Sequence, residues 1–431
     1  MVNLAEGRSK SAFTLANLFF FSLCLFVLTL YSPISQINNV SIILIGAVWL
    51  MSGGLKNIKQ LGSNKTALAL IAYYAFSALT VLYSHNKANG AKWMEYHSPL
   101  IYLPLFLGAS IITLAEKRKL LLLFAWVTSA AALLAFLFGV VRTLQTSDSE
   151  CLYNDGLGTL FDKQAVYFAM YGNFAIAIFL YFLHNKWLTK DLFRKMAVSS
   201  IVLLSVLNYF LASRSAMLVL ALLYAGTIFI LIYRQKQILT GLILLLGIFI
   251  GGFLFSQLFP KAALRLANIT ETTYDYKSLN GGDHYNAEIK GGEWNSMNTR
   301  LAVWHCASEV AREHWLTGVG AGDVEDKLQE KYKEKQFVFA LRYNLNAHNQ
   351  YLDVLISSGV GGIILFVFAF FLLPFYRAWV RKDYLLWFFM ASLALYMITE
   401  VMLNRNQGVA FIAFFLTLLS MKTEEKLVPT P

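Results

Sequence analysis

The chain has 431 residues, of which 57% are hydrophobic, 15% aromatic and only 14% charged. A water-soluble domain of this length could not bury so much apolar surface, whereas a stretch of about 20 apolar residues satisfies one helical crossing of a bilayer. The composition therefore excludes a soluble enzyme and predicts an all-α polytopic membrane protein.

In chain order, twelve apolar stretches predict about twelve membrane helices, at residues 12–33, 38–54, 66–84, 96–114, 120–141, 164–184, 196–212, 215–233, 237–259, 350–376, 383–403 and 407–421. The second, seventh and twelfth stretches are short, so we expect those helices to be tilted, shallow or kinked. The first stretch is long and lacks a small-residue cleavage pattern after it, which favours a membrane helix over a removable signal peptide.

Lys and Arg gather in one set of alternate short loops, and this sets the expected orientation. That set includes Lys117-Arg118-Lys119, Arg194-Lys195 and the run from Arg377 to Lys382, whereas the opposite loops carry few basic residues. Because cytoplasmic loops are enriched in Lys and Arg, we expect both termini in the cytoplasm. The formal net charge of +11 then follows from topology, and no nucleic-acid partner is needed to explain it.

These boundaries divide the chain into four predicted parts. Residues 1–259 hold helices one to nine, 260–347 form one large loop on the non-cytoplasmic side, 348–421 hold helices ten to twelve, and 422–431 form a cytoplasmic tail. The large loop is the one long polar stretch of the sequence, so it is the expected extramembrane domain.

The large loop begins irregularly and then becomes ordered. Gly281-Gly282 and Gly291-Gly292 lie among polar residues, which favours an irregular stretch. From Arg300 to Trp315 apolar residues recur at helical spacing, which predicts an amphipathic helix at the membrane interface. We expect a turn at Gly318 to Gly322 and then a short solvated helix from Glu325 to Lys335.

A polar pair stands where the chain returns to the membrane. His348-Asn349 is followed, after nine residues, by Gly359-x-x-Gly362. Imidazole titrates near neutrality, and bilayers tolerate such groups only where they face a cavity or a partner. If Asn346 caps the tenth helix, His348 lies in its first turn, where the helix dipole favours a neutral, proton-accepting ring and a nearby phosphate. Gly359 and Gly362 would then lie on one face and let a neighbouring helix approach closely.

Two arginines are expected at the same outer face. Ser213-Arg214-Ser215 lies at the junction of the seventh and eighth helices, and Thr299-Arg300-Leu301, with Trp304, opens the amphipathic helix. Guanidinium groups suit phosphate because they donate paired, charge-assisted hydrogen bonds. Structural alternatives stand beside these roles: Arg214 could be an interfacial anchor, Arg300 a solvated helix residue, and His348 a structural hydrogen-bonding group.

The three motifs, in this order and on this topology, resemble those of the O-antigen ligase and polymerase superfamily of bacterial envelope glycosyltransferases. The spacing of His348-Asn349 and Gly359-x-x-Gly362 is similar to the signature of the ligases, Arg214 looks like the essential external arginine, and Arg300 looks like the second. The resemblance spans about residues 160 to 410. It implies a GT-C-like architecture in the bacterial inner membrane, with the large loop between helices nine and ten and the active site on the periplasmic face.

The resemblance also implies the chemistry. The enzyme would be an inverting, metal-independent glycosyltransferase without a cofactor, with a glycan on undecaprenyl diphosphate as donor and a sugar hydroxyl of the lipid A core as acceptor. Arg214 and Arg300 would neutralise the diphosphate as its bond to the sugar breaks. His348 would be the general base that takes the proton of the acceptor hydroxyl.

Further polar residues at this face are expected to bind substrate, namely Asn349, Lys163, Gln164, Tyr167, Arg265, Arg342, Glu400 and Arg405. Asn349 would orient the ring of His348 or the substrate. Glu400 and Arg405 flank the outer end of the eleventh helix, where a structural ion pair is the alternative. Tyr167 is also an ordinary residue for an interfacial aromatic belt.

Several alternatives remain open beside the ligase. A polymerase would use a second lipid-linked glycan as acceptor, and a protein O-oligosaccharyltransferase is disfavoured by the short tail after Met421. A transporter of the same lipid is disfavoured because the chain shows no interrupted helices in matching halves. Cys24, Cys151 and Cys306 lack metal-ligand spacing, and whether Cys151 pairs with Cys306 stays open.

Overall fold

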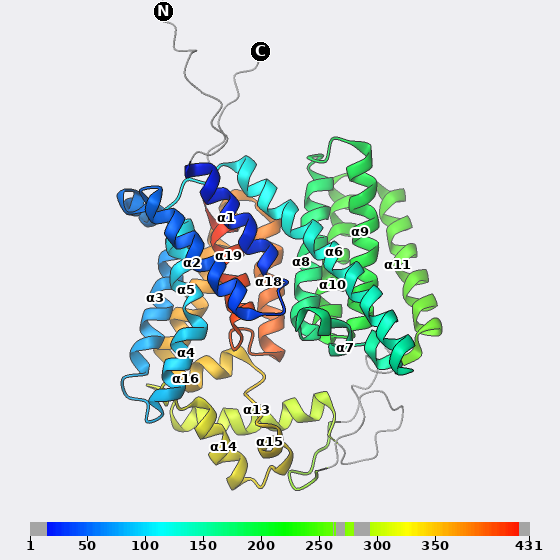
Figure 1. Cartoon of the computed structure of the whole chain (residues 1–431). Coiled ribbons are helices and arrows are strands. Elements are labelled where there is room, and N and C mark those ends of the chain that lie inside the picture. The colour runs from blue at the N-terminus through cyan, green and yellow to red at the C-terminus, as the bar shows by residue number, and fades with distance from the viewer. Residues whose placement is uncertain (1–14, 262, 264–271, 280–293, 422–431) are drawn as a thin grey trace, which may run out of the picture.

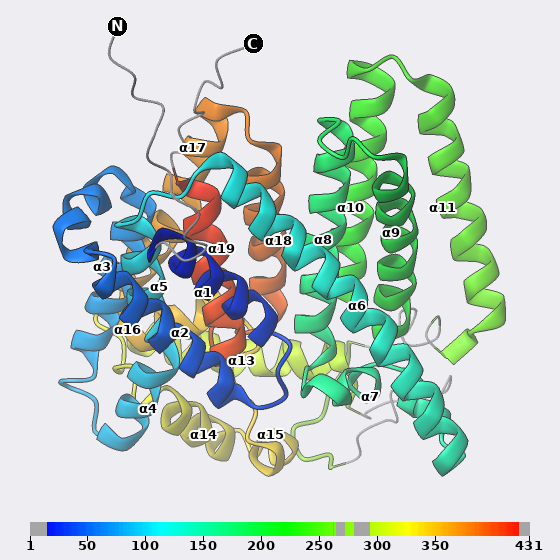
Figure 2. The same ribbon diagram turned by 45° about the horizontal axis from the view of Figure 1, so that its top comes forward.

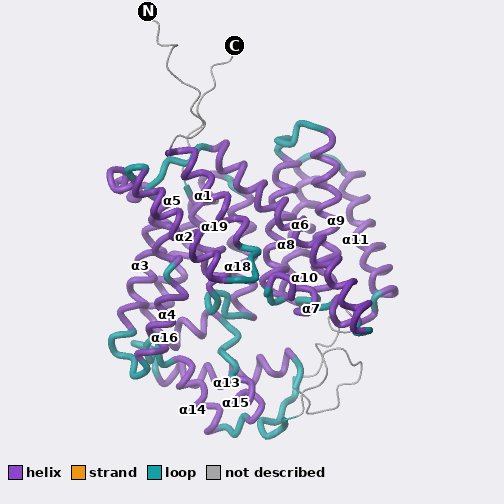
Figure 3. Tube along the Cα trace, in the orientation of Figure 1, coloured by secondary structure: helices purple, strands orange, loops and turns teal. Residues whose placement is uncertain are grey.

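The computed structural model describes residues 15–261, 263, 272–279 and 294–421, and the regular elements in these ranges are helices (Figures 1 and 3). In chain order they are α1 Leu15–Thr29, α2 Ser35–Met51, η1 Gly54–Ser63, α3 Lys65–Thr80, α4 Lys87–His97, α5 Pro99–Gly108, α6 Leu114–Thr146, η2 Ser149–Leu152, α7 Asp155–Gly158, η3 Thr159–Phe161, α8 Ala165–His184, α9 Asp191–Leu211, α10 Arg214–Phe229, η4 Ile230–Arg234, α11 Ile238–Leu258, α13 Ser296–Glu313, α14 Val324–Glu334, α15 Val338–Tyr343, α16 Gln350–Val367, η5 Phe368–Leu372, α17 Leu373–Arg381, α18 Tyr384–Thr399 and α19 Asn406–Ser420. Arg265, the stretch from Gly281 to Gly292 and the tail 422–431 lie outside the described residues.

A helix occupies each of the twelve ranges predicted from the apolar stretches. Within the described residues, six helices are long and apolar enough to cross a membrane, and a seventh span results if Gln36–Met51 and Gly54–Ser63, which meet at 105°, count as one. Asn17–Thr29 and helices α18 and α19 are shorter apolar helices. The protein is therefore a multi-pass membrane protein, and the full set of twelve crossings stays a prediction.

The membrane helices form one bundle, and the large loop gathers at one end of it. Helices α13, α14 and α15 lie below the bundle in Figure 1, at the end away from the start of α1 and the end of α19. In the turned view of Figure 2, α8 to α11 lie on one side of the bundle and α1 to α5 lie on the other. Helix α13 packs against both α14 and α16, so the extramembrane segment is attached to the bundle through α16.

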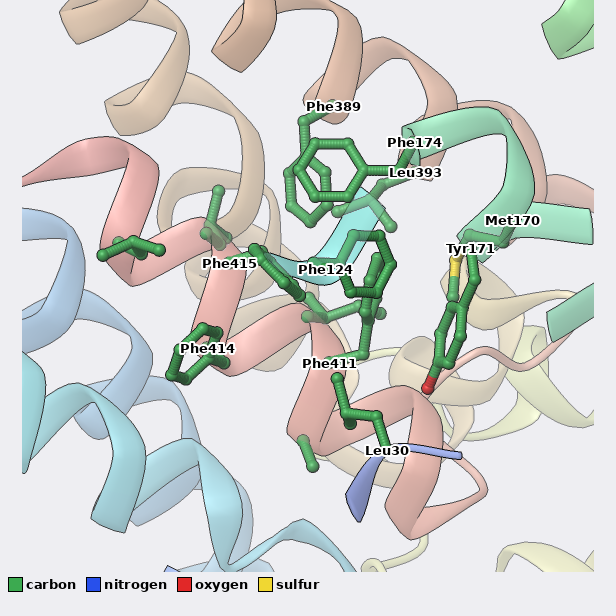
Figure 4. Close-up of a cluster of buried hydrophobic side chains, with 14 of the residues drawn as sticks. Leu30, Phe124, Met170, Tyr171, Phe174, Phe389, Leu393, Phe411, Phe414 and Phe415 are labelled. Atoms are coloured by element: carbon green, nitrogen blue, oxygen red, sulfur yellow. The ribbon is translucent and has the colours of Figure 1, made fainter. Parts of the chain in front are cut away.

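Aromatic side chains fill the centre of the bundle and bring its late helices together. Phe124 of α6 lies 4.7 Å from Phe415 of α19, measured between ring centroids, and Tyr171 of α8 stacks on Phe411 at 4.4 Å (Figure 4). Lipid is as apolar as these side chains, so close packing rather than exclusion from water holds such helices together. Helix α19 is buried from Gly408 to Ser420, which makes it the central helix.

The end of α19 remote from α13 is held by basic side chains. Lys117 Nζ donates to the Leu419 carbonyl at 3.0 Å, Arg377 Nη1 to the Ser420 carbonyl at 2.6 Å, and Arg381 Nη1 to the Met421 carbonyl at 2.7 Å. The last carbonyls of a helix lack intrahelical partners and carry its negative dipole end, so three cations there stabilise both features. Some of the basic residues that set the predicted orientation therefore also hold the fold together.

The extramembrane helices follow the prediction with two corrections. The amphipathic helix begins at Ser296, four residues before the predicted start, because Asn295 and Asn298 form a capping box around its first turn. The predicted solvated helix is α14, but one face of it is buried through Leu328 and Tyr332. The three cysteines, including Cys151 and Cys306, are free thiols.

Candidate functional site

Four chain segments meet at the end of the bundle that faces α13. They are the first residue of α10, the first two turns of α13, the loop between α18 and α19, and the residues just before α16. Polar side chains from all four join in one network of hydrogen bonds and ion pairs.

Both predicted arginines converge on the beginning of α13. Arg214 Nη1 donates to the hydroxyl of Ser296 at 2.7 Å, and Arg300 Nη1 donates to the carbonyl of the same residue at 2.8 Å. Arg214 is the first residue of α10, directly after the N-cap position Ser213. Two guanidinium groups from helices far apart in the sequence are thus brought to one place.

Arg300 also holds the end of α18. Its Nε donates to the Thr399 carbonyl at 3.0 Å, and its Nη2 lies 2.5 Å from Glu400 Oε1. Both side chains of the ion pair are about one-fifth exposed, at 23% and 21%. An arginine has five N–H donors. The bonds of Arg300 to Ser296, Thr399 and Glu400 use three of them, which leaves two for another anion.

Glu400 is the bridge between Arg300 and His348. Its second oxygen, Oε2, lies 3.3 Å from His348 Nδ1. Burial on its own raises the pKa of the Glu400 carboxyl, but the His348 hydrogen bond and the Arg300 charge outweigh that effect, and the pKa falls below its ordinary value. Glu400 is therefore ionised, and a carboxylate on Nδ1 selects the imidazole tautomer that carries its proton there and leaves Nε2 to accept one.

The backbone around His348 corrects the predicted helix start. Helix α16 begins at Gln350 and its cap is Asn349, whose Oδ1 accepts from the N–H groups of Tyr351 and Leu352 at 2.9 and 3.0 Å. Asn346 instead accepts from the N–H of His348 at 2.9 Å. The prediction that Asn346 caps the helix and His348 lies in its first turn was wrong, because both asparagines can cap and the later one does.

His348 sits just outside the helix in an unusual backbone conformation. Its φ of 43° lies in the left-handed region, which costs a non-glycine residue roughly 1 kcal/mol or more. The bond from the His348 N–H to Asn346 Oδ1 and a 3.2 Å bond from Trp304 Nε1 to the His348 carbonyl hold it there. Trp304 belongs to α13, so the same helix that carries Arg300 also fixes the histidine backbone.

Two residues near the start of α8, Lys163 and Tyr167, contact the segment that follows α18. Tyr167 donates to the Val401 carbonyl at 3.4 Å, and Lys163 Nζ donates to Gln407 Oε1 at 2.8 Å. Lys163 is buried, and burial lowers the pKa of its amine to about 7. Tyr167 therefore holds the loop that carries Glu400, and Lys163 holds the start of α19.

Gly359 has a different role from the predicted one. Its φ is 61°, and the helix is broken there, so the residue does not contribute to a smooth helical face. A Cβ on Gly359 would lie 2.3 Å from the Leu316 carbonyl oxygen. The backbone N–H of Val319 donates to Ile356 and that of Val360 to Trp315, both at 2.8 Å. The motif glycine thus opens α16 so that the turn after α13 can bind its backbone.

The remaining predicted residues lie apart from this network. Gln164 occupies the N-cap position of α8 and is exposed, Arg342 stacks on its neighbour Tyr343 on the exposed face of α15, and Arg405 is exposed at the start of α19. Within the described residues, the ion pair of Glu400 is with Arg300 and not with Arg405. Gly362 lies in α16 after the break at Gly359, where an added Cβ would clash with Ser358.

Sequence reasoning missed Ser296 and Gln350. Ser296 joins the two arginines, and Gln350 Oε1 accepts from the N–H of Leu403 at 2.8 Å, which ties α16 to the Glu400 loop. Neither has a sequence signal of its own. The sequence contained one hint about the network as a whole. Glu400 lies at the end of an apolar helix, so it must pair with a cation, but the sequence did not indicate which cation.

Two guanidinium groups, one carboxylate and one imidazole make a set of side chains suited to an anion rather than to a metal cation. The fold and this network together define a multi-pass membrane protein with a basic, histidine-containing site at one end of its helical bundle. A family model described as O-antigen ligase matches residues 199–367, which include Arg214, Arg300 and His348. The predicted resemblance to the O-antigen ligase and polymerase superfamily is thereby confirmed over this range. A search of curated proteins found no match.

Proposed function

We propose that the protein is an O-antigen ligase, an inverting glycosyltransferase that moves a glycan from undecaprenyl diphosphate to a sugar hydroxyl of the lipid A core. The observation that carries the proposal is the chain of contacts Arg300–Glu400–His348 at 2.5 and 3.3 Å, with Arg214 bound to the same serine as Arg300. It joins a group that can take a proton to groups that can bind a diphosphate.

His348 is the general base in this proposal. Glu400 holds Nδ1–H, so Nε2 takes the proton of the acceptor hydroxyl as the hydroxyl oxygen attacks the anomeric carbon. The new glycosidic C–O bond forms on the face opposite the departing diphosphate, which breaks its own C–O bond and leaves with the electron pair. This direct displacement inverts the anomeric configuration.

The arginines bind and neutralise the leaving group. Arg300 retains two N–H donors beyond its protein contacts, and Arg214 lies on the other side of Ser296. Negative charge grows on the diphosphate as the bond breaks, so fixed guanidinium groups stabilise the transition state more than the ground state. They supply the positive charge that a divalent metal supplies in other glycosyltransferases, and the proposed reaction is metal-independent.

The proposed setting is the bacterial inner membrane, with about twelve crossings in a GT-C-like arrangement, termini in the cytoplasm and the site in the periplasm. The helices that occupy the twelve predicted ranges and the basic residues at the end remote from α13 support it. Exposed Gln164, Arg342 and Arg405 remain candidates for contacts with the glycans.

The test is transfer in vitro with purified protein, undecaprenyl-diphosphate-linked glycan and lipid A core, with EDTA present. We expect product from the wild type and none from His348→Ala or Arg214→Ala. His305→Ala is the matched control, because His305 pairs with Glu309 at 3.0 Å elsewhere on α13. Longer lipid-linked glycan without ligated core would establish the polymerase instead, and lipid movement without any product would establish a transporter.

A further inference from the structure

A cavity of about 1250 Å³ opens between α8, α10, α11 and α18, away from the site described above. Its walls are mostly apolar and include Leu222, Leu231, Leu244 and Phe388. Helix α10 starts at Arg214 and its π-helical extension ends at Arg234, 21 residues in all, so the two ends lie about 30 Å apart. The cavity is lined by the later part of this helix, from Leu222 to Gln235, and therefore lies toward the end opposite His348.

One rim of the cavity is basic. Lys186 and Arg194, from the start of the α8–α9 connection and the first turn of α9, both line it and are exposed. Among the described residues, neither Lys186 nor Arg194 forms an ion pair, and Asp191 in the first turn of α9 pairs with Lys195 at 2.8 Å. Asp383, at the start of α18, is occupied as a helix cap and accepts from two backbone N–H groups at 3.1 Å. Two cations thus stand unbalanced beside an apolar space.

We propose that this cavity binds an anionic phospholipid of the leaflet opposite the His348 site. An acyl chain fills the space between α10 and α11, and the phosphate of the headgroup contacts Lys186 and Arg194. Basic residues at the mouth of a pocket between membrane helices attract anionic headgroups, and an apolar slot next to them accepts a chain. A zwitterionic lipid offers the same chain but no net charge, so it binds more weakly.

Gly226 gives direct control over the chain part of the site. It lines the cavity on α10, and a Cβ added there meets no protein atom within 4 Å. Gly226→Trp therefore fills the cavity without a clash at its Cβ. Gly247 on α11 has the same open surroundings and does not line the cavity, so Gly247→Trp is the matched control.

Native mass spectrometry of the purified full chain in detergent tests the proposal, with dioleoyl phosphatidylglycerol and dioleoyl phosphatidylcholine titrated in parallel. We expect one phosphatidylglycerol to bind more tightly than phosphatidylcholine. Lys186→Gln with Arg194→Gln should weaken it roughly thirtyfold, since each of the two basic residues near an anionic headgroup contributes about 1 kcal/mol. Gly226→Trp should remove the tight site, while Gly247→Trp should keep it.

Three outcomes would overturn the proposal. Equal affinities for phosphatidylglycerol and phosphatidylcholine would show that the basic rim does not select an anionic headgroup. Tight phosphatidylglycerol binding that survives Gly226→Trp would place the lipid elsewhere. Undecaprenyl phosphate is titrated as a third lipid. If Gly226→Trp abolishes the binding of undecaprenyl phosphate but not that of phosphatidylglycerol, the cavity binds a prenyl chain. Thermal melting of every variant separates loss of the site from loss of the fold.

Discussion

Glu400→Gln tests the contact between the carboxylate and the histidine with little change in shape. The glutamine can accept from only one of the two donors that Glu400 now serves, Arg300 Nη2 at 2.5 Å and His348 Nδ1 at 3.3 Å. Its amide group must then face the other N–H. Since Arg300 is held by two further bonds, the histidine is the partner that shifts.

The size of the effect follows from this geometry. A positioned general base contributes about 10² to 10⁴ in rate, and a charged N–H···O⁻ bond is normally about 2.7 to 2.9 Å long. The distance of 3.3 Å is longer, so we place the effect at the lower end. We expect kcat to fall about 10²-fold, or about 2.7 kcal/mol in activation free energy, with little change in the melting temperature.

The assay is initial rate of transfer in vitro under saturating donor and acceptor. Glu309→Gln is the control, because Glu309 also joins a histidine and a cation, His305 at 3.0 Å and Lys335 at 2.8 Å, but on a different part of α13. If Glu400 acts through His348, adding Glu400→Gln to His348→Ala should cause no further loss. Rates within threefold of wild type, or losses that multiply in the double variant, would refute the reasoning.

Three other predictions follow from the fold and the network. Gly359→Ala forces a side chain into a φ of 61° and to within 2.3 Å of the Leu316 carbonyl, so it should cost roughly 3 kcal/mol and lower the melting temperature; an unchanged melt would contradict the opened helix. In the wild type, the free energy of unfolding should rise with pH between about pH 7 and 10, because burial lowers the pKa of Lys163 to about 7 while the unfolded chain keeps the proton up to about 10.4. Lys163→Met should remove this rise. Melting temperatures measured at several pH values would show no difference between the two proteins if the amine stays charged. Arg214→Lys keeps the charge near Ser296 but loses the planar pair of donors, so kcat should fall about 10²-fold with the fold intact, and near-normal turnover would show that a point charge suffices.

The sequence identified the helices well because membrane spans depend on local composition. It also marked His348, Arg214 and Arg300, since the three short motifs that contain them resemble those of a known family. It could not find the bridge through Glu400, which pairs with partners 100 and 52 residues away. Such a pairing depends on how α13, α16 and the α18–α19 loop pack, and one sequence does not encode that legibly.

Local chemistry also left two equal choices that only packing resolved. Asn346 and Asn349 are both good helix caps, and the structure uses the first to hold His348 and the second to start α16. Gly359 fits both a close helix contact and a break, and the backbone bonds from the turn after α13 decide for the break. In each case the sequence identified the residue but did not predict its structural role.

The central position of α19 has a consequence for biogenesis. This helix leaves the ribosome after the helices that surround it, yet its side chains from Gly408 to Ser420 are enclosed by them. The aromatic centre built on Phe411 and Phe415 cannot assemble until α19 has entered the membrane. The loop that carries Glu400 leads directly into the start of the same helix, where Lys163 donates to Gln407. A chain still in synthesis therefore holds the matched segment 199–367 before α19 has entered the membrane, and the proposed proton transfer by His348 must wait for α19 to insert.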